Sequence, residues 1–438
     1  MGIYGALQTA VTGMAAQSFA LENISGNIAN SQTTGYKRME TGFIDLIPDA
    51  AVGRQVPGAV LAYSRSTNDV RGDIITSATG THVALNGGGF FVVAEKTGSS
   101  DGESVFGEAN FYTRRGDFEM DREGYLYNGA GYYLKGVPID SSTGNVAGSV
   151  PEMVRVSNGL IAAKATQRID YELNLPAVPA VGLLTADPGD ADFLDQTVEG
   201  GAITVYAPNG ASANVQLRWG KTADADATAT PPTADTWQLF YYGDSGWEAV
   251  SDGTATFSNG VIDTIGWGAV GADGAFPPLA LDDLTVDGTL VGDVEIDFGT
   301  GGLTQFDNAN GRASVTTLAQ DGYPAGSFMS VAINDSGRVV ATYSNGEQIE
   351  IYQLVTANFN AENQLKRLDG GVYSATAESG EAILSTDGGM TGGALESSNT
   401  DISEEFTKLI VTQQAYAAGT RIVSTSDEML QEALNMMR

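Results

Sequence analysis

A serine near the middle of the chain lies in a tetrapeptide that could carry nucleophilic chemistry. Residues 243–246 read Gly-Asp-Ser-Gly, the sequence around the nucleophile of trypsin-like proteases. Ser245 would need a base to take its proton, and the single histidine of the chain, His82, falls in a different predicted domain. Aromatic residues on both sides of the tetrapeptide favour two strands joined by a turn. We therefore expect no catalytic residues and no enzyme activity.

Carboxylates are the remaining metal ligands. With no cysteine and one histidine, the chain lacks the ligands of a zinc site, and oxygen ligands favour Ca²⁺ or Mg²⁺. The aspartates close together in sequence are Asp187, Asp190, Asp192, Asp195, Asp224 and Asp226. Their spacing matches no EF-hand loop, so a solvated acidic surface is the favoured interpretation. We expect no metal site and no cofactor.

The composition excludes several classes of partner. The formal net charge of the 438 residues is −32 at pH 7, whereas a nucleic acid or an anionic membrane requires lysine and arginine to neutralise phosphate. No apolar stretch approaches the roughly 20 residues that span a bilayer. The first residues lack the basic region, continuous apolar run and cleavage site of a secretory signal. A protein of this kind would leave a cell by another route.

Both ends of the chain carry apolar residues at seven-residue spacing. The rows are Leu7, Met14, Leu21 and Ile28 at the start, and Ile402, Leu409, Tyr416, Val423, Leu430 and Met437 at the end. This spacing is typical of helices that bury a narrow stripe against other helices. It predicts helices over about 3–30 and from about 401 to Arg438, the second beginning with a capping box formed by Asp401 and Glu404.

These rows allow two interpretations, a helical hairpin within one subunit or a surface completed by neighbouring copies. The next row of the C-terminal helix, Gln413, Thr420 and Asp427, is polar, so the apolar stripe is thin for an isolated pair. Pairing the two ends also carries a large loop-closure cost. A row of small residues, Thr412, Gly419, Ser426 and Ala433, would permit close approach of a neighbouring helix. We favour assembly and predict that the ten residues of the apolar rows are self-assembly residues.

The body between the helices is expected to be mainly β. Strand-like runs occupy about 71–156 and 327–376, with turns at 334–337 and 344–347, and 389–398 reads as a Gly/Ser linker. The segment between these runs holds all four tryptophans and few basic residues, which indicates an inserted domain. The predicted fold class is α+β, mainly β, with a terminal helical coiled-coil domain and two β-rich domains, the second inserted in the first. The predicted limits are 1–31 and 399–438 for the helices, 32–70 for an extended connector, 71–169 and 318–398 for the first β domain, and 170–317 for the insertion.

Three ordered stretches resemble the bacterial flagellar axial proteins of the rod and hook. The first is an Asn-rich helix end followed by Thr-Thr-Gly-aromatic-Lys, in which the matching residues are Asn27, Asn30, Thr33, Thr34, Gly35, Tyr36 and Lys37. The second includes residues 85–93 and 112–118, and the third runs from 393 through 416. Residues near the edges of the insertion, such as 303–306 and 320–323, are similar to landmarks of the hook member of this family.

The resemblance implies a structural subunit of the extracellular flagellar hook, a curved helical tube of many copies that transmits torque from rod to filament. The terminal helices would form the inner tube, the first β domain the middle layer and the insertion the outer surface. Implied partners are further copies of the chain, the distal rod protein, the hook–filament junction protein, the hook cap and the flagellar type III export apparatus, which requires no cleaved signal peptide. A distal rod protein of the basal body and a secreted β-rich binding protein remain the alternatives.

Overall fold

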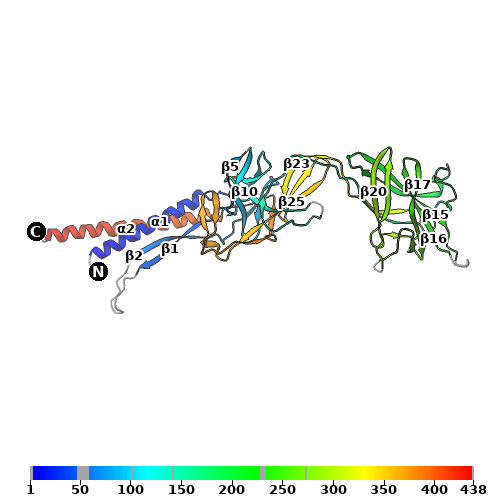
Figure 1. Cartoon of the computed structure of the whole chain (residues 1–438). Helices are drawn as coiled ribbons and strands as arrows, with labels where there is room; N and C mark the ends of the chain where they lie inside the picture. Colours follow the sequence, from blue (N-terminus) through cyan, green and yellow to red (C-terminus); the bar gives the residue numbers. More distant parts are fainter. Residues whose placement is uncertain are drawn as a thin grey trace. The chain divides into compact units, whose positions relative to one another are not determined.

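The computed structural model describes residues 3–46, 59–100, 102–140, 143–226, 233–271 and 274–436. The fold is mainly β, with a long helix near each end, as predicted (Figure 1). The chain forms two compact units. The first comprises the described residues of Met1–Asn158, Met329–Thr342 and Gln348–Arg438, and the second those of Gly159–Phe328 and Tyr343–Glu347.

The unit boundaries lie outside the predicted insertion limits of 170 and 317. The reason is a short ladder in the second unit, in which β12 (Leu160–Ile161) pairs antiparallel with residues 326 and 327 at the start of β23 (Gly326–Ile333). The finer division into helical, connector and β domains stays a prediction.

The two long helices are α1 (Ile3–Ala29) and α2 (Ile402–Met436), which lie side by side and antiparallel (Figure 1). Near one end of the pair, Asn27 Nδ2 donates to Glu405 Oε2 at 3.0 Å. Farther along, a Cβ built on Gly419 would lie 2.6 Å from Met14 Cγ. None of the described helices is both long and apolar enough to cross a membrane.

The start of α2 forms only half of the predicted capping box. Asp401 Oδ1 accepts the backbone N–H groups of Ser403 and Glu404 at 2.7 and 3.2 Å, which satisfies two donors of the first turn. The Glu404 carboxylate pairs instead with Arg38 and Lys408 at 2.8 and 2.9 Å. Two cations therefore hold the side chain that a capping box would turn back toward residue 401.

A β-hairpin follows α1 within the predicted connector. Its strands, β1 (Met39–Leu46) and β2 (Ala59–Ser66), pair antiparallel along their whole length. Asn23 Nδ2 of α1 donates to Thr41 Oγ1 at 2.9 Å, so the hairpin packs along the helix. Gly42 leaves room for the Tyr63 ring, because an added Cβ would lie 2.4 Å from that ring.

The main sheet of the first unit has the strand order β24-β25-β10-β5-β7-β28-β27. These strands are β5 (Phe90–Ser100), β7 (Phe111–Thr113), β10 (Tyr132–Pro138), β24 (Arg338–Tyr343), β25 (Gln348–Leu354), β27 (Lys366–Leu368) and β28 (Val372–Ser374). Those joining its flanks are β6 (Glu103–Phe106), β8 (Phe118–Met120), β9 (Leu126–Asn128), β11 (Glu152–Met153), β26 (Thr356–Asn358) and β29 (Ile383–Ser385). Phe90 packs in the core against Phe359 and Tyr373, with ring centroids 6.1 and 5.4 Å away.

Most of residues 389–398 belong to two short paired strands, so the prediction of a Gly/Ser linker is wrong for them. β30 (Met390–Gly392) pairs with β4 (Val83–Leu85), and β31 (Ala394–Glu396) pairs with β3 (Ile74–Thr76). One of the small residues that suggested a linker, Gly392, is required by close backbone packing. A Cβ on Gly392 would lie 2.1 Å from the Ile333 carbonyl oxygen.

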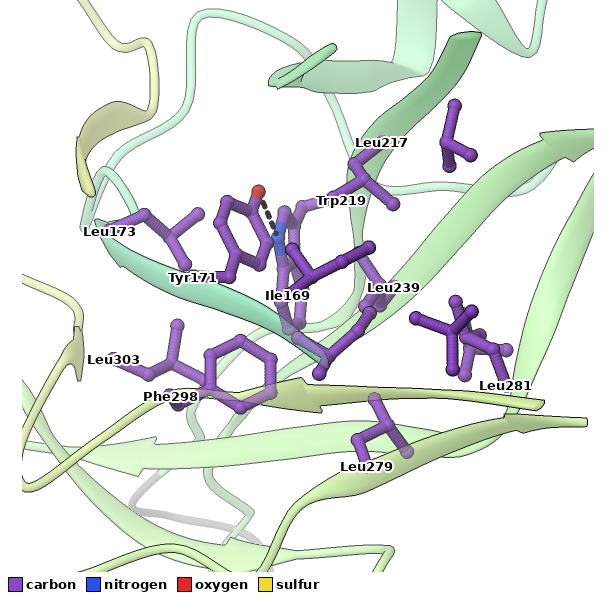
Figure 2. Packing of buried hydrophobic residues seen from close by; sticks show 14 of the residues in the cluster. Ile169, Tyr171, Leu173, Leu217, Trp219, Leu239, Leu279, Leu281, Phe298 and Leu303 are labelled. Atoms are coloured by element: carbon purple, nitrogen blue, oxygen red, sulfur yellow. Dashed lines mark hydrogen bonds between the residues drawn. The ribbon is translucent and has the colours of Figure 1, made fainter. Parts of the chain in front are cut away.

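The second unit contains two antiparallel or mixed sheets around one core. One sheet has the order β14-β15-β16-β17-β18, formed by Thr197–Tyr206, Ser212–Ala223, Asp235–Gly243, Gly246–Ser258 and Val261–Ile265. The other has the order β19-β20-β13-β21 with β22 beside β13, formed by Leu279–Val286, Thr289–Asp297, Arg168–Asn174, Leu303–Thr304 and Ser314–Gln320. Figure 2 shows the buried side chains between them, where Trp219 Nε1 donates to the Tyr171 hydroxyl at 3.2 Å.

Candidate functional site

Small and polar side chains of α2 lie at its contact with α1. On α2 the buried residues are Glu405, Thr412 and Ser426, seven or fourteen apart, and Gly419 completes this row against Met14. On α1 the buried residues are Ala10, Ala16, Ala20, Ile24 and Asn27. The row of small residues that we expected to meet a neighbouring copy therefore lies against α1 of the same chain. Ala433 belongs to the same sequence row, and its side chain is outside the description.

The predicted apolar row of α1 takes part in this contact through Met14, which packs against Gly419. The half-buried members of the two apolar rows are Leu7, Met14, Leu21, Ile28, Leu409, Val423 and Leu430. Ile402 and Tyr416 are 41% and 39% exposed. Met437 lies outside the described residues. The structure brings the other nine residues onto one helix pair, and the role of all ten in assembly stays a prediction.

Larger apolar side chains of α2 face solvent. Their exposed fractions are 50% for Phe406, 53% for Ile410, 61% for Val411, 49% for Ile422, 59% for Met429, 65% for Leu434 and 77% for Met436. Our sequence reasoning missed these residues, although three of them, Ile422, Met429 and Met436, also follow a seven-residue spacing. So many exposed large apolar side chains on one helix indicate an interaction site.

The β1–β2 hairpin adds apolar residues to the exposed surface of the first unit. Phe43, Ile44 and Leu46 on β1 and Leu61 and Tyr63 on β2 are all between 44% and 52% exposed. Neighbouring residues of a strand point to opposite faces, so both faces of the hairpin carry apolar side chains. A hairpin of this composition gains stability when both faces are covered.

The turn after α1 joins the helices to the β sheets, and it contains the residues predicted by resemblance except Asn27, which lies in the last turn of α1. Asn30 Nδ2 donates to the Gly26 carbonyl at 2.9 Å, and Thr33 Oγ1 donates to Asn30 Oδ1 at 3.2 Å, which closes the end of α1. Thr34 is half-buried in the same turn. Gly35 has φ +63°, and a Cβ there would lie 2.7 Å from the Arg114 carbonyl carbon, so this position requires glycine.

Two further residues of the turn, Tyr36 and Lys37, are buried in the junction. The Arg367 guanidinium lies 4.3 Å from the centroid of the Tyr36 ring. Lys37 Nζ contacts Glu396 Oε1 of β31 at 2.5 Å and donates to the Val70 carbonyl at 2.7 Å. These contacts explain why an aromatic residue and a lysine follow the glycine.

Glu396 is the centre of a buried ionic cluster. Its second oxygen contacts Arg114 Nη1 at 3.3 Å, and the Gly72 N–H donates to Oε1 at 2.9 Å. The side chains of Lys37, Arg114 and Glu396 are each about 1% exposed. Burial lowers the pKa of the Lys37 ammonium, and the Glu396 carboxylate offsets part of that effect. The sequence contains these three charges far apart and gives no signal that they meet.

A second group of charges surrounds the start of α2. Hydrogen bonds from Lys408 and Arg38 lower the pKa of Glu404. Glu405, 1% exposed, pairs with Lys408 at 3.0 Å and accepts from Asn27. These contacts connect α2 to both α1 and the hairpin.

The described part of the chain gives no support for a catalytic serine or for a metal site. Ser245 lies in the turn between β16 and β17, where Gly243 pairs with Gly246, so the predicted hairpin is confirmed. His82 belongs to the first unit, where its Nδ1 is 2.8 Å from Ser77 Oγ. No group of three or more potential metal-ligating side chains is close enough to hold an ion among the residues described.

Comparisons with known proteins agree with this arrangement. Models of three families match the chain: "Flagella basal body rod protein" at residues 7–37, "Flagellar hook protein FlgE/F/G D1 domain" at 84–162, and "Flagellar basal body rod FlgEFG protein C-terminal" at 391–436. The first and third cover most of α1 and α2 with their junction turns. The second covers strands of the main sheet of the first unit.

Full-length relatives are similar over both units. The flagellar hook protein FlgE of Rhizobium meliloti (strain 1021) is 30% identical over 100% of both chains, and that of Escherichia coli (strain K12) is 29% identical over 98% of this chain and 100% of its own. The crystal structure of Helicobacter pylori flagellar hook protein FlgE2 shares the fold, with a TM-score of 0.50 and 14% identity over 75% of this chain and 99% of its own. The chain therefore belongs to the flagellar hook protein FlgE family.

Proposed function

We propose that the chain is the structural subunit of the bacterial flagellar hook. Many copies assemble into a curved helical tube that acts as a universal joint, passing torque from the rod to the filament. The protein is a structural component and not an enzyme. The observation that carries the proposal is the exposed apolar surface of α2, which α1 leaves uncovered.

Neighbouring copies are the occupants that this surface fits. Because α1 already covers the small-residue row, the large apolar residues remain for contacts between chains. Such contacts join different surfaces of two copies and do not close on themselves, which generates a helix. The apolar residues of the β1–β2 hairpin lie in the same unit and extend the surface available to neighbours.

Further partners follow from the position of a hook between rod and filament. The ends of the tube would contact the distal rod protein, the hook–filament junction protein and, during growth, the hook cap. The subunit would reach this site through the flagellar type III export apparatus without a cleaved signal peptide. The terminal helices would form the inner tube and the second unit its outer surface.

Salt-induced polymerisation of the purified chain tests the proposal. Salt screens the repulsion between copies of net charge −32, so added salt should favour assembly into tubes that are curved in electron micrographs. Replacing Ile410 and Met429 by serine removes two exposed apolar side chains and should raise the protein concentration needed for assembly more than tenfold, because each loses roughly 1.5–3 kcal/mol of burial.

The matched control replaces Gln413 and Gln414, two exposed polar residues of α2, by serine. This variant should assemble as the unaltered chain does. Assembly of the I410S/M429S variant at an unaltered concentration, or straight tubes from the unaltered chain, would contradict the proposal.

A further inference from the structure

We propose that a polar collar around the start of α2 fixes the rotation of this helix, so that its small residues face α1 and its large apolar residues face outward. The collar consists of Asn27, Arg38, Glu404, Glu405 and Lys408. The inference rests on the proposed function, since the outward residues are those that neighbouring copies would cover. The collar would keep the exposed apolar residues of α2 available for assembly while the chain is still a monomer.

The collar is needed because burial of apolar surface favours a different rotation. The row of Ile402, Leu409 and Tyr416 lies three residues before the row of Glu405, Thr412 and Gly419, or about 60° around the helix. Turning α2 by that angle would bury large side chains against α1 in place of small ones. The hydrophobic effect alone therefore favours the turned arrangement. In that arrangement, less apolar surface remains for another copy.

Asn27 provides the first restraint. Its Nδ2 donates to the Met39 carbonyl at 2.8 Å and to Glu405 Oε2 at 3.0 Å. Its Oδ1 accepts the Met39 N–H at 2.8 Å and the Tyr36 hydroxyl at 3.3 Å. The amide thereby uses both donors and both lone pairs, and it is 1% exposed. The hairpin and the turn fix the orientation of this amide. Glu405 can therefore accept its hydrogen bond only when α2 is rotated so that the Glu405 side chain faces Asn27.

The neighbouring charges provide restraints at other angles around α2. Glu404 accepts from Arg38 Nη1 at 2.8 Å, on the side of the hairpin. Lys408 contacts Glu404 at 2.9 Å and Glu405 at 3.0 Å, which ties the two carboxylates together on the surface of the helix. Charge-assisted hydrogen bonds are directional and stronger than neutral ones. Turning α2 by one row would break the contacts to Asn27 and Arg38 together.

Disulfide trapping in the full chain can read the rotation, since the sequence contains no cysteine. One reporter replaces Met14 and Gly419 by cysteine and traps the observed face, in which a Cβ on residue 419 would approach Met14. The second reporter replaces Met14 and Tyr416 by cysteine and traps the turned face. Each is combined with E404L/E405L, which removes the hydrogen bonds, or with E404Q/E405Q, which removes the same charge and keeps the acceptors.

With the unaltered collar and with E404Q/E405Q, we expect the 14–419 disulfide to form and the 14–416 disulfide to be rare. With E404L/E405L, the yield of the 14–416 disulfide should rise about tenfold relative to 14–419, as expected from the loss of the hydrogen bonds that the glutamine variant keeps. The leucine variant should also assemble poorly in salt, while the thermal unfolding of its β sheets stays unaltered.

Equal trapping ratios in the leucine and glutamine variants would overturn the inference, as would failure of the 14–419 pair to form in the unaltered collar. Trapping is read within one chain and does not require tubes. Failure of every variant and of the unaltered chain to assemble would therefore refute the proposed function separately from the collar.

Discussion

Replacing Glu396 by alanine should destabilise the first unit strongly, because it leaves two buried cations without their counter-charge. Lys37 and Arg114 both contact this carboxylate, and all three side chains are about 1% exposed. Removing one partner of a buried ion pair costs roughly 3–5 kcal/mol. For a unit of this size, each kcal/mol lowers the melting temperature by about 2 °C, so a decrease of about 6–10 °C is expected.

The assay is thermal unfolding of the full chain followed by far-ultraviolet circular dichroism and calorimetry, with the transition of the second unit as an internal reference. The control is Glu378→Ala, which removes an exposed carboxylate of the same unit and should alter stability by less than about 0.5 kcal/mol. A further variant, K37M/R114M/E396L, replaces the whole cluster by apolar side chains. It should recover most of the loss, since well-packed apolar residues can replace a buried ionic cluster. A decrease below 2 °C in the alanine variant would refute this account of the junction.

Three other variants test separate parts of the structure. Gly35→Ala should destabilise the first unit by about 1–3 kcal/mol in denaturant unfolding, because φ is +63° and the new Cβ would meet backbone; an unaltered midpoint would contradict this. Lys408 and Arg38 lower the pKa of Glu404, so its carboxylate stabilises the fold above the unfolded pKa near 4.5, and this contribution is lost as pH falls through the lower folded pKa. Glu404→Gln should therefore flatten the pH dependence of the free energy of unfolding in that pH range. The same pH dependence in both proteins would argue against the pairing. Tyr171→Phe removes the hydroxyl that donates to the Gly200 carbonyl at 2.6 Å and accepts from Trp219. Unfolding followed by tryptophan fluorescence should show that the free energy of unfolding of the second unit falls by about 1–3 kcal/mol. An unaltered free energy would count against that buried network.

Local pattern was sufficient to predict the elements of the fold. The seven-residue spacing predicted the two terminal helices, and the turn residues 334–337 and 344–347 form the hydrogen bonds of tight turns, with Gly337 and Gly346 donating to Asn334 and Tyr343. Composition was sufficient to indicate that the middle of the chain is a separate β-rich region. These features depend on residues close together in sequence.

The contacts that build the candidate site could not be predicted in the same way. The face that α2 turns toward α1 involves contacts between residues far apart in sequence, such as Asn27 with Glu405, so the sequence alone did not indicate that the row of small residues lies against α1 of the same chain. Residues 389–398 were interpreted as a linker because the strands that pair with them, β3 and β4, lie far away in the sequence. The Lys37–Glu396 pair joins residues 359 positions apart, and no local pattern distinguishes these two charges from those on the surface.

Because of that separation, the junction can form only when the chain extends from Lys37 through Glu396. The segment that supplies Glu396 comes near the end of the sequence, and its partner Lys37 comes near the beginning. A fragment that stops before β31 has the first helix and most of the β sheets but cannot close the cluster or place a second helix. Shortened chains should therefore fail to enter the tube, and so they should not block its growth. Only a chain that contains both Lys37 and Glu396 can form the junction that assembly requires.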